Sequence, residues 1–173
     1  VFTNLLQDQY AIFRTSWVYG DGGNFIRTIL RLAKERTELR VIDDQFGVPT
    51  SANWLAELGS QVVISLASKQ FASGIYHAVP AGETTWHSLA QLTTQSAISA
   101  GALLKVGPEA IKPIPAVEYP LPAPRPSNSR MDTAKLREAI ESIDDMSKLQ
   151  HCKRHWGDDV KAYVAKLAQD GII

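Results

Sequence analysis

The chain has 173 residues, 45% of them hydrophobic, and its 18 Lys and Arg residues balance its 18 Asp and Glu residues. This length suits a single domain with a sizeable apolar core, and the lack of a basic excess argues against nucleic-acid and anionic-membrane partners. A single cysteine excludes an intrachain disulfide framework and is compatible with a reducing cytoplasm. The sequence has no apolar run long enough to cross a membrane as a helix.

The first part of the chain predicts a strand, a helix and a second strand. Residues 11 to 16 have the composition of a buried strand that includes Ile12. Asn24 is a suitable N-cap for a helix over 25 to 36, because its side-chain oxygen can accept a hydrogen bond from the first turn. Residues 39 to 44 are rich in β-forming residues and lead into a loop.

The middle of the chain predicts a helix, a strand and another helix. Ser51 can cap a helix over 52 to 67, and residues 74 to 79 predict the strand. Thr84 or Thr85 can cap the helix that follows. The inward positions expected for the first of these helices are Leu55, Leu58, Val62 and Leu66.

The last part begins with residues 106 to 130, which hold most of the nine prolines, so "EYPLPAPRPSNSR" predicts neither a helix nor a central strand. Asp132 opens a short helix, and residues 156 to 169 predict a final amphipathic one. Alternating strands and helices indicate an α/β fold. The strands are few for an independent doubly wound sheet, and residues 1 to 8 are typical of a helix end. We therefore expect the C-terminal part of a longer protein.

Histidine and cysteine offer candidate metal ligands. His151, Cys152 and His155 lie close together, and two of them could share a helix face. Two basic neighbours oppose a cation there, so an exposed helix surface is the favoured interpretation. His77 and His87 have no Ser or Asp partner in sequence for a catalytic triad and are expected to be structural.

Three stretches leave alternatives open. "RTSWVYG" from residue 14 places two large aromatics and a glycine after a strand, where they could plug a core or line a pocket for something flat and polar. "YGDGGN" lacks the spacing of a phosphate-binding loop and fits a tight turn equally well. In "PAPRPSNSR", Arg125 sits on a backbone stiffened by prolines, which suits a phosphate or diphosphate but also a plain surface connector.

Together with "NFIRTILRLAKER", "DQFGVPT" and "GETTWHSLA", these stretches resemble the dTDP-4-dehydrorhamnose reductase family along essentially the whole chain. Members of this family are extended short-chain dehydrogenases/reductases that make dTDP-L-rhamnose with NADPH. The resemblance implies that residues 1 to 173 are the substrate-binding, C-terminal portion of a Rossmann-like fold, with few strands and several helices. Residues 1 to 20 would be a remnant of the Rossmann sheet.

The catalytic part of that family is absent from these 173 residues. None of the five tyrosines has a lysine four residues later, although the family uses a catalytic Tyr-x-x-x-Lys helix and a glycine-rich turn in its N-terminal half. The resemblance therefore implies no catalytic residue here and an NADPH site built mainly by the other half. We expect the chain alone to be inactive.

The resemblance also implies roles for residues present in the chain. Thr15 and Ser16 would lie beside the nicotinamide and the deoxysugar, and Trp17 would stack on the sugar face. Arg125 would reach the diphosphate. The remaining residues implied for the sugar-nucleotide site are Asn24, Phe25, Gln45, Phe46, Pro49, Ser127, Asn128 and Ser129. Of these, Gln45, Phe46 and Pro49 are expected near the thymidine.

Other functions fit the same motifs. The chain could belong to a non-catalytic, regulatory subunit similar to the beta subunit of methionine adenosyltransferase. It could also belong to a related ketoreductase that acts on another dTDP-6-deoxyhexose. The resemblance further implies a possible homodimer and a possible bridging Mg²⁺.

Overall fold

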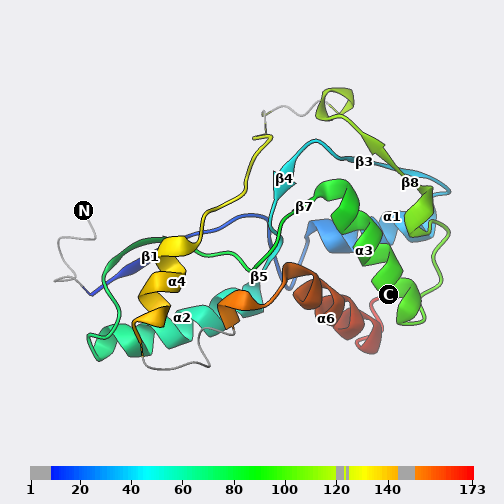
Figure 1. Ribbon diagram of the computed structural model, residues 1–173. Helices are drawn as coiled ribbons and strands as arrows, with labels where there is room; N and C mark the ends of the chain where they lie inside the picture. Colours follow the sequence, from blue (N-terminus) through cyan, green and yellow to red (C-terminus); the bar gives the residue numbers. More distant parts are fainter. Residues whose placement is uncertain (1–8, 120–122, 124, 144–150) are drawn as a thin grey trace.

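The computed structural model describes residues 9 to 119, 123, 125 to 143 and 151 to 173, and the helix end predicted at residues 1 to 8 lies outside this part. Strands and helices alternate along the described chain (Figure 1). The strands are β1 (Ala11–Arg14), β2 (Val18–Tyr19), β3 (Leu39–Ile42), β4 (Phe46–Gly47), β5 (Thr50–Ser51), β6 (Gly74–His77), β7 (Thr84–Thr85) and β8 (Ile111–Ile114). The helices are α1 (Phe25–Glu35), α2 (Ala52–Ala67), α3 (Trp86–Ser99), α4 (Ala134–Glu141) and α6 (Trp156–Gln169), with 3₁₀ turns η2 (Pro108–Ala110) and η3 (Ala116–Glu118).

Polar side chains fix where the helices begin. Asn24, Ser51 and Thr85 each accept a hydrogen bond from a backbone N–H in the first turn of α1, α2 and α3. Such bonds satisfy donors that have no partner within the helix. The Asp132 carboxylate accepts from the backbone N–H of Ala134 at 2.8 Å, immediately before α4. These predicted helix starts are confirmed.

The strands form pairs rather than one wide sheet. β1 pairs with β6, β2 with β5 and β3 with β8, all in parallel, and β4 pairs with β7 in the antiparallel sense. The prediction that 11 to 16 is a buried strand is wrong in part, because Ile12 and its neighbour Ile75 are each 42% exposed. Only one face of the β1–β6 pair packs against the cluster that α2 and α4 help to form, so the other face contacts water in the described part of the chain.

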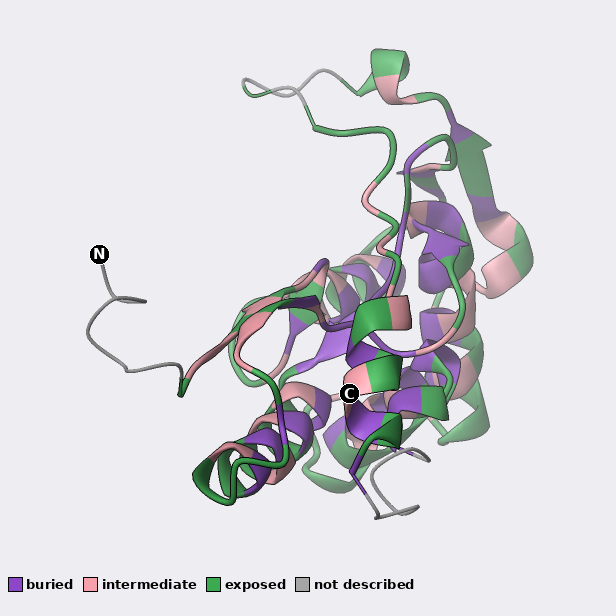
Figure 2. Cartoon of the chain, turned by 60° about the vertical axis from the view of Figure 1, so that its left-hand side comes forward, coloured by how far each residue is buried: buried purple, intermediate pink, exposed green. Residues whose placement is uncertain are grey.

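The segment rich in proline contains a strand that the sequence did not predict. β8 includes Pro113, which lies opposite Val41 of β3. Proline is tolerated there because β3 is the only strand that pairs with β8 among the described residues, and the missing N–H can face away from it. Further on, residues 125 to 130, the proline-rich arm, are almost entirely exposed (Figure 2).

Buried side chains gather in two regions of the fold. In one, α2 and α4 cover β6 with a cluster that includes Trp54, Leu58 and Val62. In the other, α1, α3 and α6 pack together and against β3 and β8. Of the inward positions expected on α2, Leu58 and Val62 are buried, whereas Leu55 and Leu66 are only partly covered.

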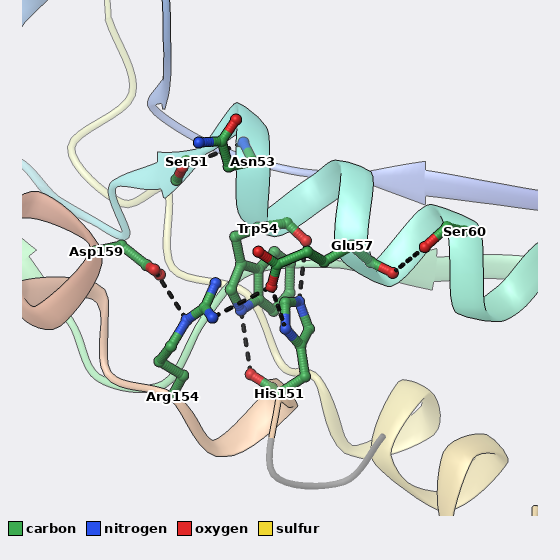
Figure 3. A network of polar contacts seen from close by, with 8 residues as sticks. All are labelled: Ser51, Asn53, Trp54, Glu57, Ser60, His151, Arg154 and Asp159. Carbon is green, nitrogen blue, oxygen red and sulfur yellow. Dashed lines mark hydrogen bonds and ion pairs between the residues drawn. The ribbon is translucent and has the colours of Figure 1, made fainter. Parts of the chain in front are cut away.

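A network of polar contacts, buried at Trp54 and His151 and half-exposed at Glu57, joins α2 to the segment before α6 (Figure 3). The indole N–H of Trp54 donates to the His151 carbonyl at 3.1 Å, and Nε2 of His151 lies 2.9 Å from the Trp54 carbonyl. Nδ1 of His151 lies 3.0 Å from a Glu57 carboxylate oxygen, which also accepts a hydrogen bond from Arg154 at 3.2 Å. Arg154 also contacts Asp159 at 2.8 Å. Side chains far apart in sequence therefore hold this corner of the fold.

Candidate functional site

A cavity of about 870 Å³ opens between α1, β3, the loop after β1 and the proline-rich arm. Its volume lies within the range of about 300–1,000 Å³ that is usual for small-molecule and cofactor sites. α1 and β3 supply mainly apolar side chains to its walls, and the arm adds polar and charged ones. Of the site residues implied by the sequence, the structure brings five together on its lining: Trp17, Phe25, Gln45, Arg125 and Ser129.

An aromatic wall bounds this cavity. The Trp17 and Trp86 rings stack with their centroids 3.7 Å apart and an angle of 16° between their planes, and Phe25 lies 4.6 Å from Trp86. Gly47 packs directly against the Trp17 ring, and a Cβ added at Gly47 would lie only 2.5 Å from Cε2 of Trp17. Trp17 also has a φ of 46°, in the left-handed region that residues with a side chain seldom adopt. The fold thus fixes this indole in one orientation at the cavity.

The "RTSW" residues therefore divide between a core role and a cavity role. The Ser16 hydroxyl donates to the Val48 carbonyl at 3.0 Å and is buried. The Thr15 hydroxyl is also buried, with no hydrogen-bond partner among the described residues. Neither residue lines the cavity, whereas Trp17 packs against the core on one side and borders the cavity on another. An unpaired buried hydroxyl is unusual and is consistent with a partner that the structure does not contain.

Asn24 is engaged in local structure. Its oxygen caps α1 by accepting from the Arg27 backbone N–H at 3.1 Å. Its amide nitrogen donates to the Gly20 carbonyl at 2.8 Å and to the Tyr163 hydroxyl at 2.9 Å, which ties the glycine turn to α6. Asn24 does not line the cavity, whereas its neighbour Phe25 does. The "YGDGGN" stretch thus forms a fixed turn before a helix.

The "DQFGVPT" residues also separate. Gln45 is buried and borders the cavity, so its amide can contact a ligand. Pro49 is buried away from the lining. Phe46 is 38% exposed and packs beneath the Arg130 guanidinium, whose carbon lies 5.1 Å from the ring centroid. Only Gln45 of the three residues expected near thymidine reaches the cavity.

The proline-rich arm reaches the cavity because its backbone bonds to β4. The Phe46 N–H donates to the Ser127 carbonyl at 2.9 Å, and the Ser129 N–H donates to the Phe46 carbonyl at 2.7 Å. Arg125 and Ser129 line the cavity, whereas Ser127 and Asn128 do not. Among the described residues, no acidic side chain pairs with Arg125, so its guanidinium can bind an anionic ligand.

The sequence did not predict the far end of the cavity. Arg36, Glu38 and Arg40 line it together with Glu118 and Tyr119. An ion pair between Arg40 and Glu118 links β3 to η3 across this end. Helical spacing along α1 and alternation along β3 could have indicated which residues share a face, but not that η3 lies opposite them.

The expectation of an exposed surface around His151, Cys152 and His155 is wrong for the first two, which are buried. They are covered because the segment before α6 is bound to α2 through Trp54. In the part of the chain that the structure describes, no group of His, Cys, Asp and Glu side chains could hold a metal ion. The expected structural histidines accord with their contacts, since ring nitrogens of His77 and His87 lie 2.9 Å from backbone carbonyls.

Burial should make the single cysteine unreactive. Removal from water raises the pKa of the Cys152 thiol from 9.0 to about 11, against a smaller lowering by Arg137. This rise reduces the thiolate fraction about a hundredfold. At pH 8 we expect iodoacetamide to alkylate the folded chain at least about a hundred times more slowly than the urea-unfolded chain. Equal rates, followed by mass spectrometry, would contradict this burial.

The described fold and cavity define a class of protein. Parallel strand pairs, the helices between them and a ligand-sized cavity give the α/β architecture of an extended short-chain dehydrogenase/reductase. Two solved structures support this class. The dTDP-4-dehydrorhamnose reductase of Clostridium acetobutylicum superposes with a TM-score of 0.74 at 30% identity, over 91% of this chain and 49% of that one. The Bacillus anthracis enzyme, solved in complex with NADP, superposes with a TM-score of 0.73 at 27% identity, over 95% of this chain and 51% of that one.

The family follows from the sequence comparison. The pattern of the RmlD substrate binding domain matches residues 3 to 168, and the chain belongs to this family. Proteins named dTDP-4-dehydrorhamnose reductase are 47% identical over 131 residues in Shigella flexneri and 44% identical over 142 residues in Salmonella typhimurium. These matches cover 75% and 80% of this chain but only 43% and 47% of those proteins. The chain thus spans less than half the length of these relatives.

Proposed function

We propose that this chain supplies the sugar-nucleotide site of an NADPH-dependent reductase that converts the 4-keto group of dTDP-4-dehydro-L-rhamnose to the alcohol of dTDP-L-rhamnose. The observation that carries the proposal is the cavity, whose lining combines a fixed aromatic wall with the Arg125 guanidinium, which has no acidic partner among the described residues. Aromatic faces suit the apolar faces of a sugar or base, and a guanidinium suits a diphosphate. Relatives at 44–47% identity carry this activity in their names.

Within this function, the chain binds and orients the substrate. Trp17 limits the positions that a sugar ring can take, the Gln45 amide offers a donor and an acceptor, and Arg125 attracts the diphosphate. Holding a substrate in one orientation contributes to rate without any proton transfer. The 173 residues contain no Tyr-x-x-x-Lys sequence to supply the proton.

The residues present fit only the rim of a nicotinamide site. Thr15 precedes Trp17 by two residues, and its buried hydroxyl has no hydrogen-bond partner among the described residues, so it has capacity left to bond a cofactor, whereas Ser16 is already bonded to Val48. The 173 residues contain no glycine-rich phosphate-binding sequence. NADPH would supply the hydride in the longer enzyme. A homodimer and Mg²⁺ binding stay predictions of the family resemblance, and a cytoplasmic location stays a prediction from the cysteine content.

Calorimetry with dTDP tests the proposal. We expect the chain to bind dTDP, and the Arg125→Ala variant to bind it about tenfold to a hundredfold more weakly, because charged hydrogen bonds contribute about 1.5–3 kcal/mol. Arg31→Ala is the matched control, since Arg31 pairs with Glu35 on the exposed side of α1. NADPH oxidation by the chain alone should stay at background.

Two outcomes would contradict the proposal. Substrate-dependent NADPH oxidation by the 173-residue chain would overturn the assignment of proton donor and cofactor cradle to another part of the enzyme. Absence of dTDP binding, both in this chain and in a longer protein that contains it, would favour the regulatory subunit instead.

A further inference from the structure

Outside the cavity, the Arg130 side chain joins its own segment, the proline-rich arm, to two neighbouring segments. Nε of Arg130 donates to the Asn128 side-chain oxygen at 3.0 Å, and Nη1 donates to Glu83 at 3.3 Å. The guanidinium carbon lies 5.1 Å from the centroid of the Phe46 ring, which it covers. The Arg130 backbone N–H also donates to the Asn128 oxygen at 3.0 Å. The cavity lining does not include Arg130.

Phe46 is the middle member of this arrangement. On one side its backbone bonds to the proline-rich arm through Ser127 and Ser129. On the other side it pairs with Thr85 of β7, and Glu83 directly precedes that strand. Arg130 therefore starts from the arm, crosses the face of β4 and ends at the carboxylate beside β7. Its contacts hold the three segments in one register.

Two residues of the cavity lining, Arg125 and Ser129, belong to the arm, so their positions depend on how the arm pairs with β4. Ser129 is bonded to Phe46 and lines the cavity, and Arg125 lines it four residues earlier. We propose that Arg130 is a positioning residue, which clasps the arm to β4 and thereby sets where Arg125 and Ser129 face the ligand. This inference rests on the proposed function. It gives Phe46 and Asn128 a structural role in the clasp in place of the ligand contacts expected from the sequence.

The clasp is expected to tune the site, not to maintain the whole fold. Both members of the Arg130–Glu83 pair are partly exposed, at 44% and 56%, and exposed ion pairs contribute little to stability. A cation–π contact at an exposed position is also modest. However, all three contacts need the same Arg130 rotamer. Removing the guanidinium therefore takes away both side-chain contacts from the arm to Phe46 and Glu83, together with the bond to Asn128 that holds the rotamer. Losing an exposed ion pair and an exposed cation–π contact together is expected to change the affinity for a ligand by about fivefold to tenfold.

Binding of dTDP tests the clasp. We expect Arg130→Ala to weaken binding about fivefold to tenfold, Arg130→Lys to restore part of the loss, and Arg31→Ala to leave affinity unchanged. If Arg130 acts through the arm, adding Arg130→Ala to Arg125→Ala should cause little further loss. Wild-type affinity in Arg130→Ala would overturn the proposal, as would an equal loss whether or not Arg125 is present.

A second measurement needs no ligand. Hydrogen exchange at the Phe46 and Ser129 amides, which bond the arm to β4, should become faster in Arg130→Ala. The Tyr76 amide in the β1–β6 pair serves as the internal control and should not change. If the wild-type chain does not bind dTDP, the proposed function fails while exchange still tests the clasp. Unchanged exchange at Phe46 and Ser129 would overturn the clasp itself.

Discussion

Replacing Trp54 by alanine should lower the free energy of unfolding by about 3–5 kcal/mol, the range for deletion of a fully buried large aromatic side chain. Trp54 is completely buried, and its ring stacks on His151 with centroids 4.9 Å apart. Its indole N–H also donates to the His151 carbonyl. Alanine would leave a cavity at the joint between α2 and the segment before α6. It would also remove one of the two hydrogen bonds that the His151 carbonyl accepts, the other coming from the Arg154 backbone N–H at 3.2 Å.

Urea unfolding followed by circular dichroism measures this effect, with two variants for comparison. Trp54→Phe keeps most of the ring and loses only the donor, so we expect a loss of about 1–2 kcal/mol. Val63→Ala is the control on the same helix, because Val63 is 65% exposed and should change stability by less than about 0.5 kcal/mol. Similar losses for Trp54→Phe and Val63→Ala would show that the hydrogen bond from the indole to the His151 carbonyl contributes nothing to stability.

Trp17→Ala should reduce the affinity for a dTDP-deoxysugar by about tenfold or more, equivalent to about 1.4 kcal/mol. Trp17 borders the cavity and stacks on Trp86, so its loss removes one wall and uncovers another aromatic face. Trp17→Phe keeps a flat ring and should bind with intermediate affinity. If Trp17→Ala binds as well as the wild type, the indole only fills the core.

Gly47 supplies an independent test of the same wall. An alanine methyl at this position would meet the Trp17 ring at 2.5 Å, so Gly47→Ala should displace the indole and weaken binding in the wild-type background. In Trp17→Ala the obstacle is gone, and the same substitution should be nearly neutral. Calorimetry on the four proteins of this cycle gives the coupling between the two positions. Additive losses would mean that Gly47 acts by another route.

Local chemistry explains which features could be predicted from the sequence. Asn24, Ser51 and Thr85 cap helices through bonds to residues two or three positions away, so their role depends on adjacent sequence only. The family follows from the order and spacing of motifs such as "RTSW" and "RPSNS", and the match over residues 3 to 168 confirms it. The α/β class is also confirmed, because helical and strand periodicities are properties of short segments.

Burial and pairing depend on distant segments. Ile12 is an apolar residue in a strand and was expected in the core. It is partly exposed because no described element covers that face of β1. His151 has basic neighbours and was expected at the surface, yet it is buried. Trp54, which is 97 positions away in the sequence, lies against it in the fold. Neither outcome can be read from the neighbours of these residues along the chain.

The sequence by itself determined the family, the helix starts and the presence of an arginine on a proline-stiffened arm. Only the tertiary structure decided which candidates share a cavity. Arg125 and Trp17 both border it because β4 lies between the arm and the loop after β1, bonding to the arm and packing Gly47 against the indole. Asn24, Phe46 and Asn128 instead contact other parts of the protein. Asn24 caps α1, and Phe46 and Asn128 both contact the Arg130 side chain.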